Sequence, residues 1–245
     1  MNRSFPFLLL LVITLGHAQE VKESEVSLAT KRYRAYRLQF TEPSFALAKV
    51  KAIIARIKSK PDQGGDGEWL ATPAWNSMSP PEKFTYCMIH GEVSTQVCDV
   101  PPWLTDEEHK IFGQLTGFAN EQSWSDRQRA FLKGHRSEVV RLMRTTIREK
   151  GRVGVNLKSA ISDLGLYELI PDLTSIYRKD RKDQDILTVL LLLMEEGKDK
   201  PFLTSITYGK LYGKDANFAS YIVANRANQD LTMQRAMAYY HRRVG

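Results

Sequence analysis

The sequence predicts a mainly α-helical protein built from short antiparallel helices. The seven residues Ile170–Ile176 return thirty positions later as Lys200–Ile206, with Pro, Leu, Thr, Ser and Ile in matching places. A fixed offset of this size is typical of stacked helical units, which bury one face against their neighbours. From residue 79 onward, helix start and stop signals are frequent, and the alternation typical of strands is almost missing. We therefore expect about nine or ten short helices in residues 79–245.

The first eighteen residues are typical of a secretory signal peptide. Arg3 precedes the apolar run Phe5–Leu15, and the small residues Gly16 and Ala18 follow it. The run is too short for a membrane-spanning helix, which needs about 20 residues. We expect cleavage near Ala18 and export to the periplasm or the medium, with no integral membrane segment in the mature chain. An uncleaved membrane anchor is the alternative.

The charge of the chain bears on its partners. The formal net charge is +7 at neutral pH, and the predicted cleavage removes only one arginine. A basic protein attracts anionic partners, and export makes nucleic acid the least expected of these. We expect a protein partner, which can be an acidic protein, and no nucleic acid. The basic residues are interleaved with acids, as in Arg178–Asp183, which is also typical of a solvated surface.

Cys87 and Cys98 are the two cysteines of the chain. In an oxidising compartment such a pair is more often bonded than free, and closing this short loop would stabilise the fold by roughly 2–3 kcal/mol. The alternatives are a metal site or a reactive thiol. His90 is the only histidine between the cysteines, and the haem-attachment spacing Cys-x-x-Cys-His is absent. We expect a Cys87–Cys98 disulfide.

The mature chain divides into three expected parts: an N-terminal helical segment with an exposed loop at 19–78, a helical region with the disulfide at 79–136, and a helical-repeat region at 137–245. Ser44–Lys60 has the apolar spacing of an amphipathic helix, which Pro61 ends. The following run, Pro61–Gly67, has the glycine and aspartate content of a loop. Tyr36–Phe40 fits a strand or a helix equally well.

Capping signals place most of the later helices. Ser79–Glu82 combines a capping hydroxyl, two prolines in the first turn and a glutamate that can reach back, which predicts a helix to His90. Thr105–Glu108 repeats the capping-box pattern. The other predicted starts and ends are Ser125, Ser137, Asp183 and Asp215, and Gly134, Gly151, Gly165 and Gly197.

The repeat region resembles the short form of HEAT-like repeats. Its marks are Leu169-Ile170-Pro171-x-Leu173, a charged turn, a second apolar helix at Ile186–Met194, and another Pro201-x-Leu203. The resemblance covers roughly residues 137–245. It implies that the proline-bearing helix lies on the convex side and that its partner helix lines the concave side. An irregular helical bundle, in which two helices share a phrase, is the alternative.

Strong catalytic motifs are absent, and this lowers the expectation of an enzyme without abolishing it. The alternative to a binding protein is a cell-envelope glycan hydrolase or lyase, in which Glu92 at a helix end is the general acid and Glu82 assists. Lytic transglycosylases, which it would resemble, have Glu-Ser where this chain has Glu92-Val93-Ser94. Asp106 and His109 lack a visible third ligand, so we expect neither a metal nor a cofactor.

Basic and aromatic residues are the candidate binding groups. Arg141, Arg144 and Arg148 share one face of a predicted helix and can dock an acidic partner, although a solvated face is the alternative. Trp103 and Trp124 can anchor a ligand or cap the helical core. The leading hypothesis is an exported, non-enzymatic helical-repeat scaffold that binds a protein through the groove of its C-terminal solenoid.

Overall fold

Short helices make up most of the structure, a computed structural model that describes residues 20–57, 69–94, 102–115 and 122–245. The predicted mainly α fold is confirmed, because these ranges hold twelve α-helices and three antiparallel sheets of two strands each. The helices are α1 (Leu28–Arg37), α2 (Leu47–Ile54), α3 (Thr72–Ser77), α4 (Pro80–Ile89), α5 (Asp126–Gly134), α6 (Arg136–Lys150), α7 (Val155–Asp163), α8 (Ile170–Asp180), α9 (Gln184–Glu196), α10 (Lys200–Leu203), α11 (Ile206–Tyr212) and α12 (Arg226–Val244). The strand pairs are β1 (Glu20–Val21) with β3 (Trp103–Leu104), β2 (Val93–Ser94) with β5 (Gln122–Ser123), and β4 (Lys110–Phe112) with β6 (Tyr221–Val223).

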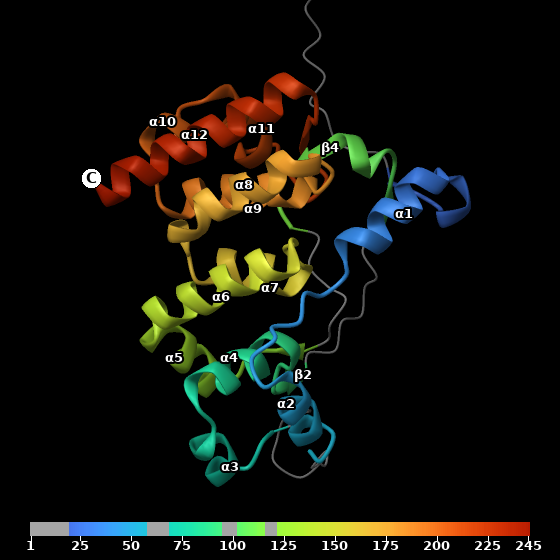
Figure 1. Ribbon diagram of the computed structural model, residues 1–245. Helices are drawn as coiled ribbons and strands as arrows, with labels where there is room; N and C mark the ends of the chain where they lie inside the picture. Colours follow the sequence, from blue (N-terminus) through green and yellow to red (C-terminus); the bar gives the residue numbers. More distant parts are fainter. Residues whose placement is uncertain (1–19, 58–68, 95–101, 116–121) are drawn as a thin grey trace, which may run out of the picture.

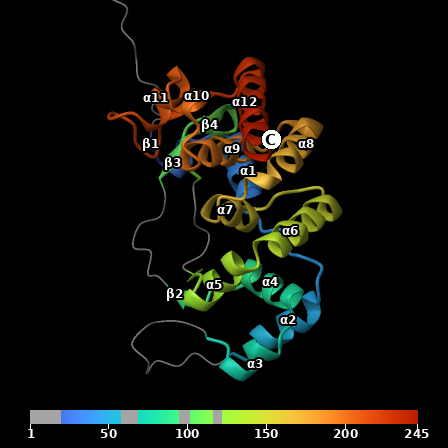
Figure 2. The same ribbon diagram turned by 90° about the vertical axis from the view of Figure 1, so that its left-hand side faces the viewer.

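The helices follow one another in layers along the molecule (Figure 1, Figure 2). α2 and α3 lie at one end, then come α4 with α5, α6 with α7 and α8 with α9, and α10, α11 and α12 form the other end. Contacts join the layers: α4 packs on α2, α6 and α7, α7 packs on α9, and α12 packs on α8 and α9. The stacking of helices extends beyond the region in which the sequence repeats.

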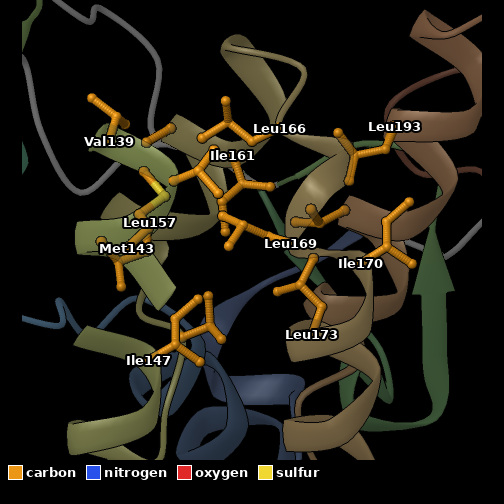
Figure 3. Packing of buried hydrophobic residues seen from close by; sticks show 14 of the residues in the cluster. Val139, Met143, Ile147, Leu157, Ile161, Leu166, Leu169, Ile170, Leu173 and Leu193 are labelled. Carbon is orange, nitrogen blue, oxygen red and sulfur yellow. The ribbon is translucent and has the colours of Figure 1, made fainter. Parts of the chain in front are cut away.

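One cluster of buried apolar side chains holds these layers together. It runs from Val50 in α2 to Tyr239 in α12. Its middle contains Ile147 of α6, Leu157 of α7 and Leu173 of α8, all fully buried (Figure 3). Burial of each such side chain contributes about 1.5–3 kcal/mol. Because the cluster crosses the boundaries expected near residues 79 and 137, the described residues of the three expected parts share a core.

The local capping signals place several helix starts correctly. The Glu82 carboxylate accepts a hydrogen bond from the backbone N–H of Ser79 at 2.9 Å, as the capping box predicts, and α4 ends at Ile89. Ser125 and Asp183 directly precede α5 and α9. Such signals depend on residues within one turn, so the sequence contains all that is needed to recognise them.

Two other predicted starts differ from the structure. α6 begins at Arg136, one residue before Ser137. Asp215 lies in a turn ahead of β6, and α12 begins only after Asn225, whose side chain accepts a hydrogen bond from the N–H of Asn228.

The segment after Thr105 is also different from its prediction. A single 3-10 turn at Glu107–His109 leads into β4 instead of a helix. β4 pairs with β6, and the Thr188 hydroxyl of α9 donates a hydrogen bond to the carbonyl of Phe112 at 2.9 Å. Pairing with a distant strand therefore overrides the local helix signal.

The repeated phrase takes two different structures. Its first copy lies in the continuous helix α8. The second copy is interrupted: α10 ends at Leu203, and Ser205 caps α11 by accepting a hydrogen bond from the N–H of Tyr208 at 3.2 Å. Both copies begin a helix one residue before the proline, but only the first continues it.

The N-terminal segment covers the helices that the HEAT-like resemblance places on the concave side. α1 ends at Arg37, so Tyr36 and Arg37 of the undecided stretch are helical and residues 38–40 are not. Arg37 binds Asp185 of α9, and β4 also packs on α9. At the start of α7, a Cβ on Gly154 would lie 2.3 Å from the backbone nitrogen of Thr41. The α7 and α9 side is thus occupied by the chain itself.

Several predictions fall partly or wholly outside the described residues. The predicted signal peptide and the Pro61–Gly67 loop lie there. Of the predicted Ser44–Lys60 helix, the structure shows α2 and a turn up to Ile57. None of the helices in the described ranges is long and apolar enough to cross a bilayer.

Candidate functional site

A groove on the outer side of the stack, between α6, α8 and α12, is the candidate functional site. Its volume is about 640 Å³, within the range of about 300–1,000 Å³ that is common for ligand sites. Residues on one face of α6 and of α8 line it, together with Tyr240 of α12. The lining residues are Arg144, Ile147, Arg148, Pro171, Asp172, Ser175, Ile176, Lys179 and Tyr240.

The carboxylate of Asp172 holds two arginines of α6 at this groove. Arg144 Nε donates to Asp172 Oδ2 at 2.8 Å, and Arg148 Nη2 lies 3.0 Å from Asp172 Oδ1. Arg144 Nη2 also donates to the backbone carbonyl of Glu168 at 2.9 Å. The Asp172 side chain is 8% exposed, whereas that of Arg148 is 70% exposed. A nearly buried acid therefore fixes two guanidinium groups that remain accessible from the groove.

The remaining lining combines apolar surface with one more cation. Ile176 and Tyr240 contribute apolar surface from α8 and α12, and Lys179 lies towards the C-terminal end of α8. Three of the lining residues are cationic and one is acidic, so the groove attracts anionic groups. Apolar walls with a few converging charges are typical of a binding site.

The predicted arginine stripe is divided by the structure. Arg144 and Arg148 line the groove, whereas Arg141 forms an ion pair with Glu138 on the same helix at 3.0 Å and does not line it. This exposed pair of side chains three residues apart has the ordinary role of a solvated helix surface.

The two candidate tryptophans lie elsewhere. Trp103 belongs to β3, and the guanidinium carbon of Arg34 lies 4.3 Å from the centre of its ring. Trp124 donates a hydrogen bond from Nε1 to the carbonyl of Cys87 at 2.7 Å and packs against the core. Both indoles are partly buried by these contacts, and neither lines the groove.

Glu92, the candidate general acid, is fully buried and ion-paired. Its carboxylate accepts hydrogen bonds from Arg127 Nε at 2.8 Å, from the Tyr86 hydroxyl at 3.0 Å and from the Ser125 hydroxyl. Burial alone would raise the pKa of Glu92. The hydrogen bonds from Arg127, Ser125 and Tyr86 and the charge of Arg127 outweigh this effect, so the pKa is lowered. A general acid needs the opposite shift. This geometry favours a structural role for Glu92.

Glu82 likewise has the environment of a structural carboxylate. A hydrogen bond from Lys49 at 2.7 Å and the one from the Ser79 backbone lower the pKa of Glu82. Both groups that the glycan-cleaving alternative names are thus stabilised as carboxylates.

The predicted disulfide is not shown by the structure. Cys87 is a free thiol, buried in α4, and Cys98 lies outside the described residues. Burial raises the pKa of the Cys87 thiol well above its ordinary value, which disfavours the reactive thiolate. Among the described residues, no group of three or more His, Cys, Asp or Glu side chains is placed to hold a metal ion.

A buried charge cluster, which the sequence did not predict, joins α1 to the helix stack. Arg37 donates to Asp185 Oδ2 at 2.9 Å and to Glu107 Oε2 at 3.0 Å. Lys158 of α7 donates to Asp183 Oδ1 at 2.6 Å and lies 3.6 Å from Asp185 Oδ2. All five side chains are at most 5% exposed. Of these five residues, the sequence pattern marked only Asp183 individually, as a helix start.

The pKa values of the two aspartates of this cluster are shifted in opposite directions. Burial raises the pKa of Asp183, whose Oδ2 has no hydrogen-bond partner in the described parts of the chain. Burial also acts to raise the pKa of Asp185, but the charges of Arg37 and Lys158 outweigh it, and the pKa is lowered. The cluster therefore stabilises one ionised aspartate more than the other and closes the α7 and α9 side of the stack.

Comparisons of the chain with protein-family models, with curated proteins and with solved structures found no match in any of the three. The groove is therefore the feature of the molecule that bears on its function.

Proposed function

We propose that the mature chain is an exported, non-enzymatic scaffold that binds a protein partner through the groove between α6, α8 and α12. The observation that carries this proposal is the pair of arginines, Arg144 and Arg148, which the nearly buried Asp172 fixes beside apolar walls. Interfaces are enriched in arginine and aromatic side chains, and a pre-positioned guanidinium loses less freedom on binding.

The architecture supports a scaffold of the HEAT-like kind. α6 with α7 and α8 with α9 form two successive helix pairs, and α8 carries the proline near its start. Such arrays bind partners on surfaces built from several units. In this chain the groove lies on the side of α6 and α8, because α1 and β4 cover α9.

Site-specific crosslinking tests the proposal. A photoreactive phenylalanine analogue at Ser175, an exposed groove residue, should capture a discrete protein in the cell envelope of the source organism. The same analogue at Lys133, exposed on α5 outside the groove, is the control. Charge reversal by Arg148→Glu should abolish the adduct at Ser175. No adduct at Ser175, or one that persists with Arg148→Glu, would refute the proposal.

The export part of the proposal has a separate measurement. The N-terminal sequence of the protein recovered from cells should begin near Gln19, and its mass should match that start. The protein should be found in the envelope or the medium. Retention of Met1 in a cytoplasmic fraction would contradict it.

A further inference from the structure

We infer that the groove recognises an extended acidic segment with two carboxylates three residues apart and an apolar residue between them. This inference rests on the proposed function and names the kind of segment that the partner presents. It depends on where the cations lie along α8 and on the surface between them.

The first step is the direction of the groove. Pro171, Ser175 and Lys179 line it and are four residues apart on α8, so they lie on one face of this helix. At 1.5 Å per residue, the groove follows α8 for about 12 Å. It is therefore a track parallel to the helix axis.

The second step is the position of positive charge. The two guanidinium groups lie at the level of Asp172, and Lys179 lies seven residues further along α8, which corresponds to about 10 Å. The Nη1 groups of Arg144 and Arg148 make no hydrogen bond to any residue in the described ranges. Within the same ranges, Lys179 forms no ion pair. Donors are thus available at both ends of the track.

The third step is the match to a peptide backbone. Three residues of an extended or polyproline II chain advance about 9–10 Å, and in polyproline II the first and fourth side chains lie on the same side. A peptide of this form places one carboxylate at the arginine pair and the other at Lys179. The residues between the acids then lie over Ile176 and beside Tyr240, which favours an apolar side chain there.

Three capped, fluorescently labelled peptides of equal length test this inference. Their core sequences are Glu-Leu-Pro-Glu, Glu-Glu-Leu-Pro and Gln-Leu-Pro-Gln, so the first two have the same composition and charge. The intact mature chain should bind the first at least about tenfold more tightly than the second, since one charge-assisted hydrogen bond is lost, and more tightly still than the third. Binding should weaken as salt is raised.

A matched pair of variants separates the groove from general attraction to a basic protein. Lys179→Met should remove the preference for Glu-Leu-Pro-Glu over Glu-Glu-Leu-Pro, whereas Lys133→Met on α5 should retain it. Equal affinities for the two acidic peptides, no binding of either, or a preference that survives Lys179→Met would overturn the inference. If crosslinking at Ser175 still depends on Arg148 in that case, the proposed function stands and only the spacing rule fails.

Discussion

Replacing Arg37 with methionine tests whether the buried charge cluster holds α1 to the helix stack. The Arg37 side chain is 1% exposed and binds both Asp185 and Glu107. Methionine fills much of the same space but cannot donate a hydrogen bond. The variant therefore leaves two buried carboxylates without their main partner.

The remaining contacts set the magnitude. Asp185 keeps Lys158 Nζ at 3.6 Å, and Glu107 keeps Arg34 Nη1 at 3.6 Å. Breaking a buried ion pair by removing one partner costs about 3–5 kcal/mol. For a chain of this size each kcal/mol lowers Tm by about 2–4 °C, so Arg37→Met should lower Tm by roughly 6–20 °C.

The pH dependence of the loss has a definite sign. Because the pKa of Asp185 is lowered in the fold, its stabilising contribution is present above the unfolded pKa of about 3.9 and is lost as pH falls through the folded value. The difference in unfolding free energy between the natural chain and Arg37→Met should thus be largest near neutral pH. It should shrink in acid.

Urea and thermal unfolding followed by circular dichroism provide the measurement, with Arg178→Met as the control because Arg178 is exposed on α8. The control should change stability by less than about 0.5 kcal/mol. Arg37→Met with Asp185→Leu should recover part of the loss, since an apolar pair needs no counter-charge. A loss below 1 kcal/mol for Arg37→Met, or an equal loss for the control, would refute the reasoning.

Three further predictions concern other buried groups. Glu92→Gln should destabilise the fold by about 1–3 kcal/mol at pH 7 and by less below about pH 4, because the pKa of Glu92 is lowered and its ionised form is the one that stabilises the fold. Urea unfolding at both pH values checks this, and an unchanged stability at pH 7 contradicts it. In a Cys98→Ser background, Cys87 should resist alkylation at pH 8 until denaturant is added, as mass spectrometry can show; rapid labelling of the folded chain would show an accessible thiol. Gly154→Ala should lower the free energy of unfolding by about 1–3 kcal/mol, because a Cβ there meets the Thr41 backbone. Gly134→Ala, whose Cβ would meet no atom within 4 Å, should be neutral or slightly stabilising. Thermal melts that rank the two variants in the opposite order would contradict this.

The parts of the fold that could be predicted from sequence are those that depend on neighbours within a turn. The capping box at Ser79 and the left-handed residue Gly151 after α6, with φ 61°, are of this kind. β4 is not, because it depends on pairing with β6 from the far end of the chain. Nor is the Arg37–Asp185 pair, whose members are 148 residues apart. No local pattern marks an arginine as the partner of one distant acid.

The candidate site divides in the same way. Helical spacing alone placed Arg144 and Arg148 on one face of α6. The sequence could not show that Asp172 of the next helix pair would hold them, since this needs the packing of α6 on α8. Without that acid, the same two arginines are an ordinary solvated helix face, which was the alternative interpretation.

The two copies of the repeated phrase show how packing turns one sequence into two structures. After the shared Leu-Thr-Ser-Ile, the first copy continues with Tyr177, which is fully buried and donates a hydrogen bond to Gln184 at 2.8 Å, so burial extends α8 beyond the phrase. The second copy continues with Thr207, which is too small to provide such an anchor, and Ser205 instead caps a new helix. The two copies differ at their first and third positions, and at the third position Asp172 of the first copy corresponds to Phe202 of the second, which is buried in the core. Only the aspartate can fix the arginines of α6, so this difference between the copies places the anchored guanidinium pair at the groove beside the first copy.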